Sequence, residues 1–352
     1  MSASTRRVHR AAGRQASWLP TARMRRSEYN TVTYRCLLAL IGLMLAPSVS
    51  GAQGSHPSQN GSGDEYTLQL NADMVVLSAT VLDRHNALVS GLGKDDFRIY
   101  EDGVPQQIEQ FSHEDIPVTA GILVDNSGSM GPKRNDVIAA ALAFARSSNP
   151  QDQMFVVNFN DRVSFGLPAN ILFTDQREQL EEALFGISAI GETSMYDGIA
   201  AGLERLKLGN RDKKVLILIS DGGDNASKHS LAQVLGMAKQ SAAIIYAIGI
   251  FDERDGDQKP GVLWRFARET GGEAFFPESS SEIASICEGI ARDIRNQYTL
   301  TYVPKIAPQD GKYRTIEVKA SAPGRGRLSV RTRAGYSVPL AEPDSGSKGA
   351  RP

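Results

Sequence analysis

Cysteine and histidine are scarce in this sequence of 352 residues. Its two cysteines are Cys36 and Cys287, and its five histidines are scattered without the spacing of a zinc site. If the first residues are removed on export, Cys287 is left alone, so we expect no internal disulfide and a fold that depends on its hydrophobic core. Cys287 shares a helical face with neighbouring isoleucines, which predicts a buried, unreactive thiol.

Positive charge is also scarce once the amino-terminal segment is set aside. Residues 1–52 contain eight arginines, no lysine and one acidic residue, Glu28. The rest of the chain has 31 basic and 39 acidic residues, a net charge of −8. A chain this acidic is poorly suited to nucleic acids or anionic membrane surfaces, so we expect neither as a partner.

The apolar run near the amino terminus is too short to cross a membrane. It covers 11 residues, 36–46, whereas a spanning helix needs about 20. Arg25 and Arg26 precede the run and Pro47 ends it. A basic stretch followed by a short apolar run is typical of an export signal.

The end of this segment indicates where the signal is cut. Small residues at 50–52 resemble a signal peptidase site, so we predict a signal peptide over 1–52 and a mature chain that begins near Gln53. Met24 stands directly before two arginines and is the expected true start. We therefore expect export to the periplasm, the cell envelope or the medium, with no membrane span after the signal is removed.

Motifs of common hydrolases are missing. The Gly-x-Ser-x-Gly turn of serine hydrolases is absent. A phosphotransferase with an aspartate nucleophile would need a second aspartate two residues after Asp125, where Ser127 stands. We therefore expect a binding protein and no enzyme. The alternatives that stay open are a structural envelope protein with a stabilising metal and a metal-dependent phosphohydrolase.

Hydrophobic periodicity divides the rest of the chain. Strands alternate with amphipathic helices between the flanking segments, and this alternation predicts a doubly wound α/β fold with a mostly parallel sheet. Both flanks alternate as β-strands do and are too small to hold a core alone, so we predict one small all-β module built from both. The expected parts are a linker at 53–63, a β segment at 64–115, the α/β domain at 116–297, a second β segment at 298–340 and a disordered tail at 341–352.

Oxygen-bearing side chains gather in three loops of the α/β domain. Asp125, Ser127 and Ser129 follow the apolar strand 118–124, and a second loop, 220–224, follows the apolar strand 215–219. The third loop, 191–198, leads into a helix. In a doubly wound sheet, ligands bind beyond the carboxyl ends of the strands, so we expect these loops to meet. Each residue also has a simpler interpretation as a helix cap or a turn residue.

Five of these residues resemble a known metal site. Asp125, Ser127, Ser129, Thr193 and Asp221 match, in order, the metal-ion-dependent adhesion site of von Willebrand factor A domains, and the resemblance covers about residues 117–296. The wider chain resembles a group of exported bacterial proteins with this domain, in the segments 80–84, 94–103, 246–249, 270–272 and 333–336.

The resemblance implies a division of labour at the metal. Ser127, Ser129 and Thr193 are expected to bind the cation directly, whereas Asp125 and Asp221 act through water. All five offer hard oxygen, which suits Mg²⁺ first, and also Mn²⁺ or Ca²⁺, but not zinc. Neutral ligands leave the cation under-compensated, so the implied partner is a protein or peptide that supplies an acidic side chain.

The other acidic residues of these loops receive a structural interpretation. We expect Asp197 and Asp224 to be structural or to act outside the metal's own ligands. The acidic segment 252–257 has no closing glutamate at the position that an EF-hand requires, so we expect a solvated loop.

Overall fold

The computed structural model describes residues 74–185, 188–251, 258–305 and 312–337, which all belong to one unit of the chain. The predicted signal peptide, the linker, the tail and the acidic loop 252–257 lie outside the described residues. Among the described helices, none is both long and apolar enough to cross a membrane.

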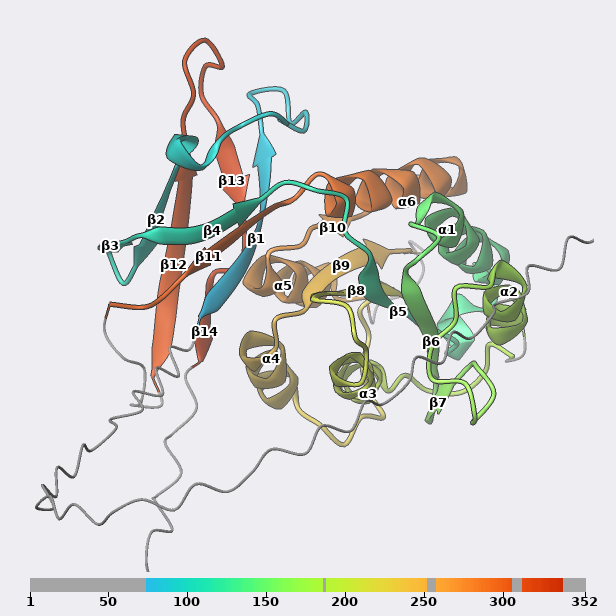
Figure 1. The fold of residues 1–352 in the computed structure, drawn as a ribbon. Coiled ribbons are helices and arrows are strands. Elements are labelled where there is room, and N and C mark those ends of the chain that lie inside the picture. The colour runs from blue at the N-terminus through green and yellow to red at the C-terminus, as the bar shows by residue number, and fades with distance from the viewer. Residues whose placement is uncertain (1–73, 186–187, 252–257, 306–311, 338–352) are drawn as a thin grey trace, which may run out of the picture. The chain divides into compact units, whose positions relative to one another are not determined.

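A six-stranded sheet forms the centre of the α/β domain (Figure 1). Its strand order is β10-β9-β8-β5-β6-β7, and all neighbours are parallel except the β6–β7 pair. The central strands are buried on both faces, as their unbroken apolar sequences require. The strands are β5 (Val118–Asp125), β6 (Gln153–Phe159), β7 (Val163–Phe165), β8 (Lys213–Ser220), β9 (Ile244–Gly249) and β10 (Ala274–Phe275).

Six described helices cover this sheet in two layers (Figure 1). One layer contains α1, α2 and α6, and in the other α4 packs between α3 and α5. The doubly wound fold predicted from the sequence is confirmed. The helices are α1 (Arg134–Ser147), α2 (Arg177–Phe185), α3 (Met195–Lys207), α4 (Leu231–Gln240), α5 (Pro260–Thr270) and α6 (Ser280–Arg295), with short 3-10 turns at Lys94–Asp96 and Gly128–Met130.

The flanks form the predicted all-β module. Its two four-stranded antiparallel sheets have the orders β13-β1-β11-β4 and β14-β12-β2-β3, so each combines strands from both flanks. The module has its own core, which includes Leu77, Phe97 and Tyr298. The strands are β1 (Val75–Leu82), β2 (Phe97–Glu101), β3 (Val104–Gln106), β4 (Ile108–Ser112), β11 (Tyr298–Tyr302), β12 (Tyr313–Ala320), β13 (Ser329–Arg331) and β14 (Gly335–Ser337).

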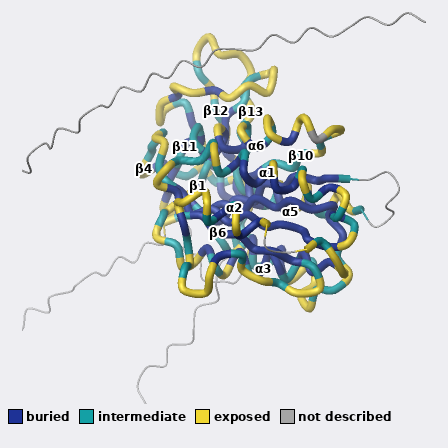
Figure 2. The backbone as a smooth tube through the Cα atoms, turned by 90° about the vertical axis from the view of Figure 1, so that its right-hand side faces the viewer, coloured by how far each residue is buried: buried dark blue, intermediate teal, exposed yellow. Residues whose placement is uncertain are grey.

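Burial follows this plan. Figure 2 shows the buried backbone concentrated in the centre of the α/β domain, and exposed backbone in its connecting loops. Cys287 lies in the α/β core on α6, and burial raises the pKa of its thiol to about 12. The expectation of a buried, unreactive thiol therefore fits the structure.

Candidate functional site

Four of the five candidate metal residues form one chain of hydrogen bonds. Asp125 ends β5, and its Oδ1 accepts hydrogen bonds from Ser127 N (2.9 Å) and Ser127 Oγ (2.6 Å). The hydroxyls of Ser127 and Ser129 lie 3.2 Å apart, and Ser129 Oγ donates to Asp221 Oδ2 at 2.7 Å. Because β5 and β8 are parallel and adjacent, their carboxyl ends bring these two loops together.

Thr193, the fifth candidate, lies at the same place. It lines a hollow of about 260 Å³ together with Ser127, Ser129 and Asp221. Its backbone N–H donates to Asn225 Oδ1 at 2.8 Å, and its carbonyl accepts from the N–H of Asn225. Thr193 Oγ1 has no hydrogen-bond partner among the described residues, so its oxygen remains available to a ligand.

The alternative interpretation as helix caps fails for two residues. The N-cap of α1 is Lys133 and that of α3 is Ser194, so neither Ser129 nor Thr193 occupies a cap position. Asp221 is only 3% exposed, which is too buried for a residue that merely solvates a turn. The geometry therefore favours a common role for these side chains.

Ser220 belongs to the loop 220–224 that the sequence grouped with the candidate site, but its contact with Asp125 was not predicted. Its hydroxyl donates to Asp125 Oδ2 at 2.6 Å. Both carboxylate oxygens of Asp125 are thus engaged by neighbouring hydroxyls, which suits a residue that orients other groups. The signal in the sequence was weak, since Ser220 is simply the last residue of a buried strand, directly before Asp221.

Asp161 is a residue that sequence analysis missed, and it holds the loop that carries Thr193. Its Oδ1 accepts a hydrogen bond from the backbone N–H of Glu192 at 2.6 Å. Gly191 has a φ of +85°, and a Cβ there would lie 2.3 Å from Asp161 Oδ2, so only glycine fits. Ser194 Oγ also bonds to the carbonyl of Asn160 at 2.7 Å.

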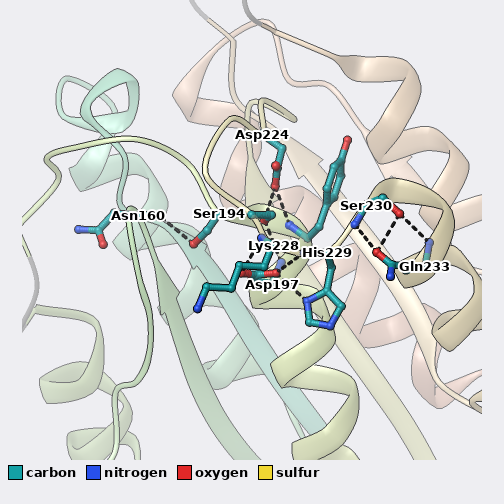
Figure 3. A network of polar contacts seen from close by, with 10 residues as sticks. Asn160, Ser194, Asp197, Asp224, Lys228, His229, Ser230 and Gln233 are labelled. Atoms are coloured by element: carbon teal, nitrogen blue, oxygen red, sulfur yellow. Dashed lines mark hydrogen bonds and ion pairs between the residues drawn. The ribbon is translucent and has the colours of Figure 1, made fainter.

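Asp197 and Asp224 connect the beginning of α3 to the loop after β8 (Figure 3). Asp197 accepts hydrogen bonds from the backbone N–H groups of Lys228 (3.0 Å) and His229 (2.9 Å), and its Oδ1 lies 2.7 Å from His229 Nδ1. Burial alone would raise the pKa of Asp197, but these contacts outweigh it and hold the pKa below its usual value. Asp224 accepts from Tyr196 N at 2.8 Å. These contacts agree with the structural interpretation of both residues.

The charges of the site leave a place for a cation. Asp125 and Asp221 are 1% and 3% exposed, and neither forms an ion pair with any described residue. Burial raises the pKa of Asp125 to about 6, the hydroxyls of Ser127 and Ser220 oppose the rise, and the charge of Asp221 adds to it. Two buried carboxylates without a cationic partner are unfavourable, and a bound cation would remove the penalty.

The donor set of this hollow decides which ion would fit. In the part of the chain that the structure describes, no three His, Cys, Asp or Glu residues converge as metal ligands. A metal at this hollow would therefore depend on the hydroxyl oxygens of Ser127, Ser129 and Thr193 besides the two carboxylates. Such an all-oxygen set fits a hard divalent cation.

Comparisons with known proteins identify the class of this domain. Residues 121–288 match the family model of the von Willebrand factor type A domain. No curated protein matches the chain. Similar solved structures include a von Willebrand factor type A protein from Catenulispora acidiphila, with 14% identity, a TM-score of 0.46, and 77% of this chain and 74% of that chain covered.

Two further similar structures come from surface and matrix proteins. One is the von Willebrand factor domain of the type V pili tip protein Mfa5 from Porphyromonas gingivalis, with 14% identity and a TM-score of 0.43. The alignment covers 51% of this chain and 95% of that chain. Proximal thread matrix protein 1 of the mussel byssus, with zinc in its metal site, has 18% identity and a TM-score of 0.43, with 55% and 49% covered. The family match therefore identifies a von Willebrand factor type A domain within the chain, at residues 121–288.

Proposed function

We propose that this protein is an exported adhesion or protein-interaction module that binds one divalent cation and holds a partner through it. The observation that carries the proposal is the chain of hydrogen bonds from Asp125 through Ser127 and Ser129 to Asp221, with two buried carboxylates that form no ion pair within the described part of the chain. The family of the domain supports the same function.

The residues of the hollow divide the work in this proposal. Ser127, Ser129 and Thr193 would hold the cation through their hydroxyl oxygens. Asp125 already accepts from Ser127 and Ser220, so it would orient hydroxyls and water. The bound cation, Mg²⁺ first and otherwise Mn²⁺ or Ca²⁺, supplies a positive centre for an acidic side chain of a protein or peptide partner.

Metal-dependent capture tests this function. The mature chain is immobilised and exposed to envelope extract of the source cell in Mg²⁺, with a chelator as comparison. We expect a partner that is retained in Mg²⁺, released by the chelator and lost with Asp125→Ala. Asp175→Ala, which removes an exposed carboxylate outside the site, is the matched control and should capture normally.

Other outcomes point to other functions. If Mg²⁺ raises the thermal stability of the chain but no partner depends on it, the metal only stabilises the fold, as in a structural envelope protein. Turnover of phosphate esters that Asp125→Ala abolishes would indicate a phosphohydrolase instead.

Export is a separate part of the proposal and has its own test. It relies on the basic stretch and short apolar run before residue 53. Amino-terminal sequencing of the exported protein should read from near Gln53. A mature protein that still contains Cys36 would contradict it.

A further inference from the structure

Glu192 is a charged residue at the rim of the metal hollow for which the proposed function has no role. It lines the same 260 Å³ hollow as Ser127, Ser129 and Thr193. Its side chain is exposed, and no hydrogen bond or ion pair engages its carboxylate among the described residues. Lys259, the other basic or acidic residue at this rim besides the aspartates, forms no ion pair with it.

The backbone beneath Glu192 is fixed although its carboxylate is not. The Glu192 N–H donates to Asp161 at 2.6 Å, and Gly191, with its φ of +85°, packs against the same carboxylate. On the other side, Thr193 is tied to Asn225. The Cα of Glu192 is therefore held beside the hollow, while its side chain can reach toward it or away from it.

The three residues proposed to contact a cation directly in this hollow carry no charge. Three candidates are neutral hydroxyls, both oxygens of Asp125 are engaged by hydroxyls and a backbone N–H, and Asp221 accepts from Ser129. A divalent ion in this place attracts any carboxylate within reach. Glu192 offers one from the hollow's own rim.

We propose that Glu192 is a resident carboxylate that occupies the cation's partner-facing position until a partner's acidic side chain displaces it. This inference rests on the proposed metal site and adds to it an internal ligand that competes with the partner. Glu192 strengthens metal binding and at the same time competes with the partner. Its removal should therefore change the two properties in opposite directions.

Manganese provides a probe that measures both properties on the full mature chain. Mn²⁺ affinity is obtained from a titration, and the relaxation rate of water protons per bound Mn²⁺ reports how many positions on the ion are open to water. With Glu192→Gln we expect Mn²⁺ affinity to fall by about tenfold, in the range of supporting groups at metal sites. The water relaxation per bound ion should rise, and added acetate should reduce it at lower concentration than in the wild type.

Controls separate this inference from the proposed function. Glu288→Gln removes an exposed carboxylate on α6, away from the hollow, and should leave both readouts unchanged. If the wild type and Asp125→Ala both bind no Mn²⁺, the metal site itself is wrong. If the wild type binds Mn²⁺ and Glu192→Gln has unchanged relaxation, with or without weaker affinity, Glu192 does not reach the ion and only this inference is overturned.

Discussion

The buried side chain of Lys213 makes the stability of the fold depend on pH. It is 6% exposed, and its Nζ donates to the carbonyl of Ile294 at 2.9 Å. Burial lowers the pKa of Lys213 to about 8, although the charges of Asp293, Asp115 and Asp152 oppose the shift. The ammonium group is therefore held in the folded state at an energetic penalty.

Substitution of Lys213 by methionine should remove this pH dependence. The pKa of Lys213 is about 8 in the folded chain and 10.5 in an unfolded one. Between these two pH values the unfolded chain binds more protons, so the contribution of Lys213 to stability rises with pH. The free energy of unfolding of the wild type minus that of Lys213→Met should increase by roughly 2 kcal/mol from pH 7 to pH 10. Urea unfolding at both values measures it, and parallel pH profiles for the two proteins would contradict the buried-ammonium explanation.

Residue patterns predicted which side chains belong to the candidate site better than they predicted the contacts that hold those side chains in place. Asp125, Ser127 and Ser129 could be grouped because they are adjacent and follow an apolar strand. The contact of Ser220 with Asp125 and the contact of Asp161 with Glu192 were not predicted, because contacts between loops depend on how the strands pair. Ser220 faces Asp125 only because β5 and β8 pair in the register that aligns Val124 with Ile219.

At the scale of elements, a buried cluster joins the α/β domain to the β module. Asp293 on α6 is the centre of this cluster, and it accepts hydrogen bonds from Thr80 Oγ1 on β1 (2.6 Å) and Tyr246 Oη on β9 (2.7 Å). Arg331 on β13 forms ion pairs with Asp293 and with Glu273. Four elements that are distant in sequence thus share one carboxylate.

Loss of Arg331 should strongly destabilise the protein. Arg331→Leu leaves Asp293, whose side chain is 8% exposed, without its cation. Removal of one partner from a buried pair costs about 3–5 kcal/mol. Urea denaturation should show this loss, and Arg331→Leu combined with Asp293→Leu should recover part of it because the buried, unpaired carboxylate of Asp293 is then gone. A single variant within about 0.5 kcal/mol of the wild type, as expected of an ordinary surface substitution, would show that the cluster is not a buried pair.

Element length determined which elements the sequence revealed. The helices and the long strands carry enough residues for a period to show, as in the apolar face of α1 and the unbroken β8. The edge strands β7 and β10 were not predicted, since three and two residues cannot display a period. The turn between β2 and β3 lies at Asp102-Gly103, and both residues have positive φ, at 47° and 79°.

At the scale of the whole molecule, the carboxy-terminal flank completes both sheets of the β module. β11 lies between β1 and β4, and β12 lies between β14 and β2. Strand alternation predicted that the flanks would combine, and the structure confirms it. The sequence did not reveal the strand order, because either flank could have supplied the central strands.

Deletion of residues 298–352 should therefore unfold the amino-terminal β segment. It removes β11 and β12, so that β1 and β4 lose their shared neighbour and β2 keeps only β3. Hydrogen exchange of the segment 75–112 should become fast, while the central strands β5 and β8 stay more protected. Unchanged protection of 75–112 would contradict a module that needs both flanks.

The most direct test of the proposed metal site is a calorimetric titration with Mg²⁺ and Mn²⁺. It compares the wild type with Asp125→Ala, Ser127→Ala and Thr193→Ala, and circular dichroism checks that each variant is folded. We expect one ion per chain in the wild type, weaker binding in every variant, and the largest loss, about 10–100-fold, for Asp125→Ala, which removes a buried charge and the acceptor that orients Ser127. Equal binding by all four proteins would mean that the three loops meet without forming a metal site. It would also contradict the proposed adhesion function, which depends on that site.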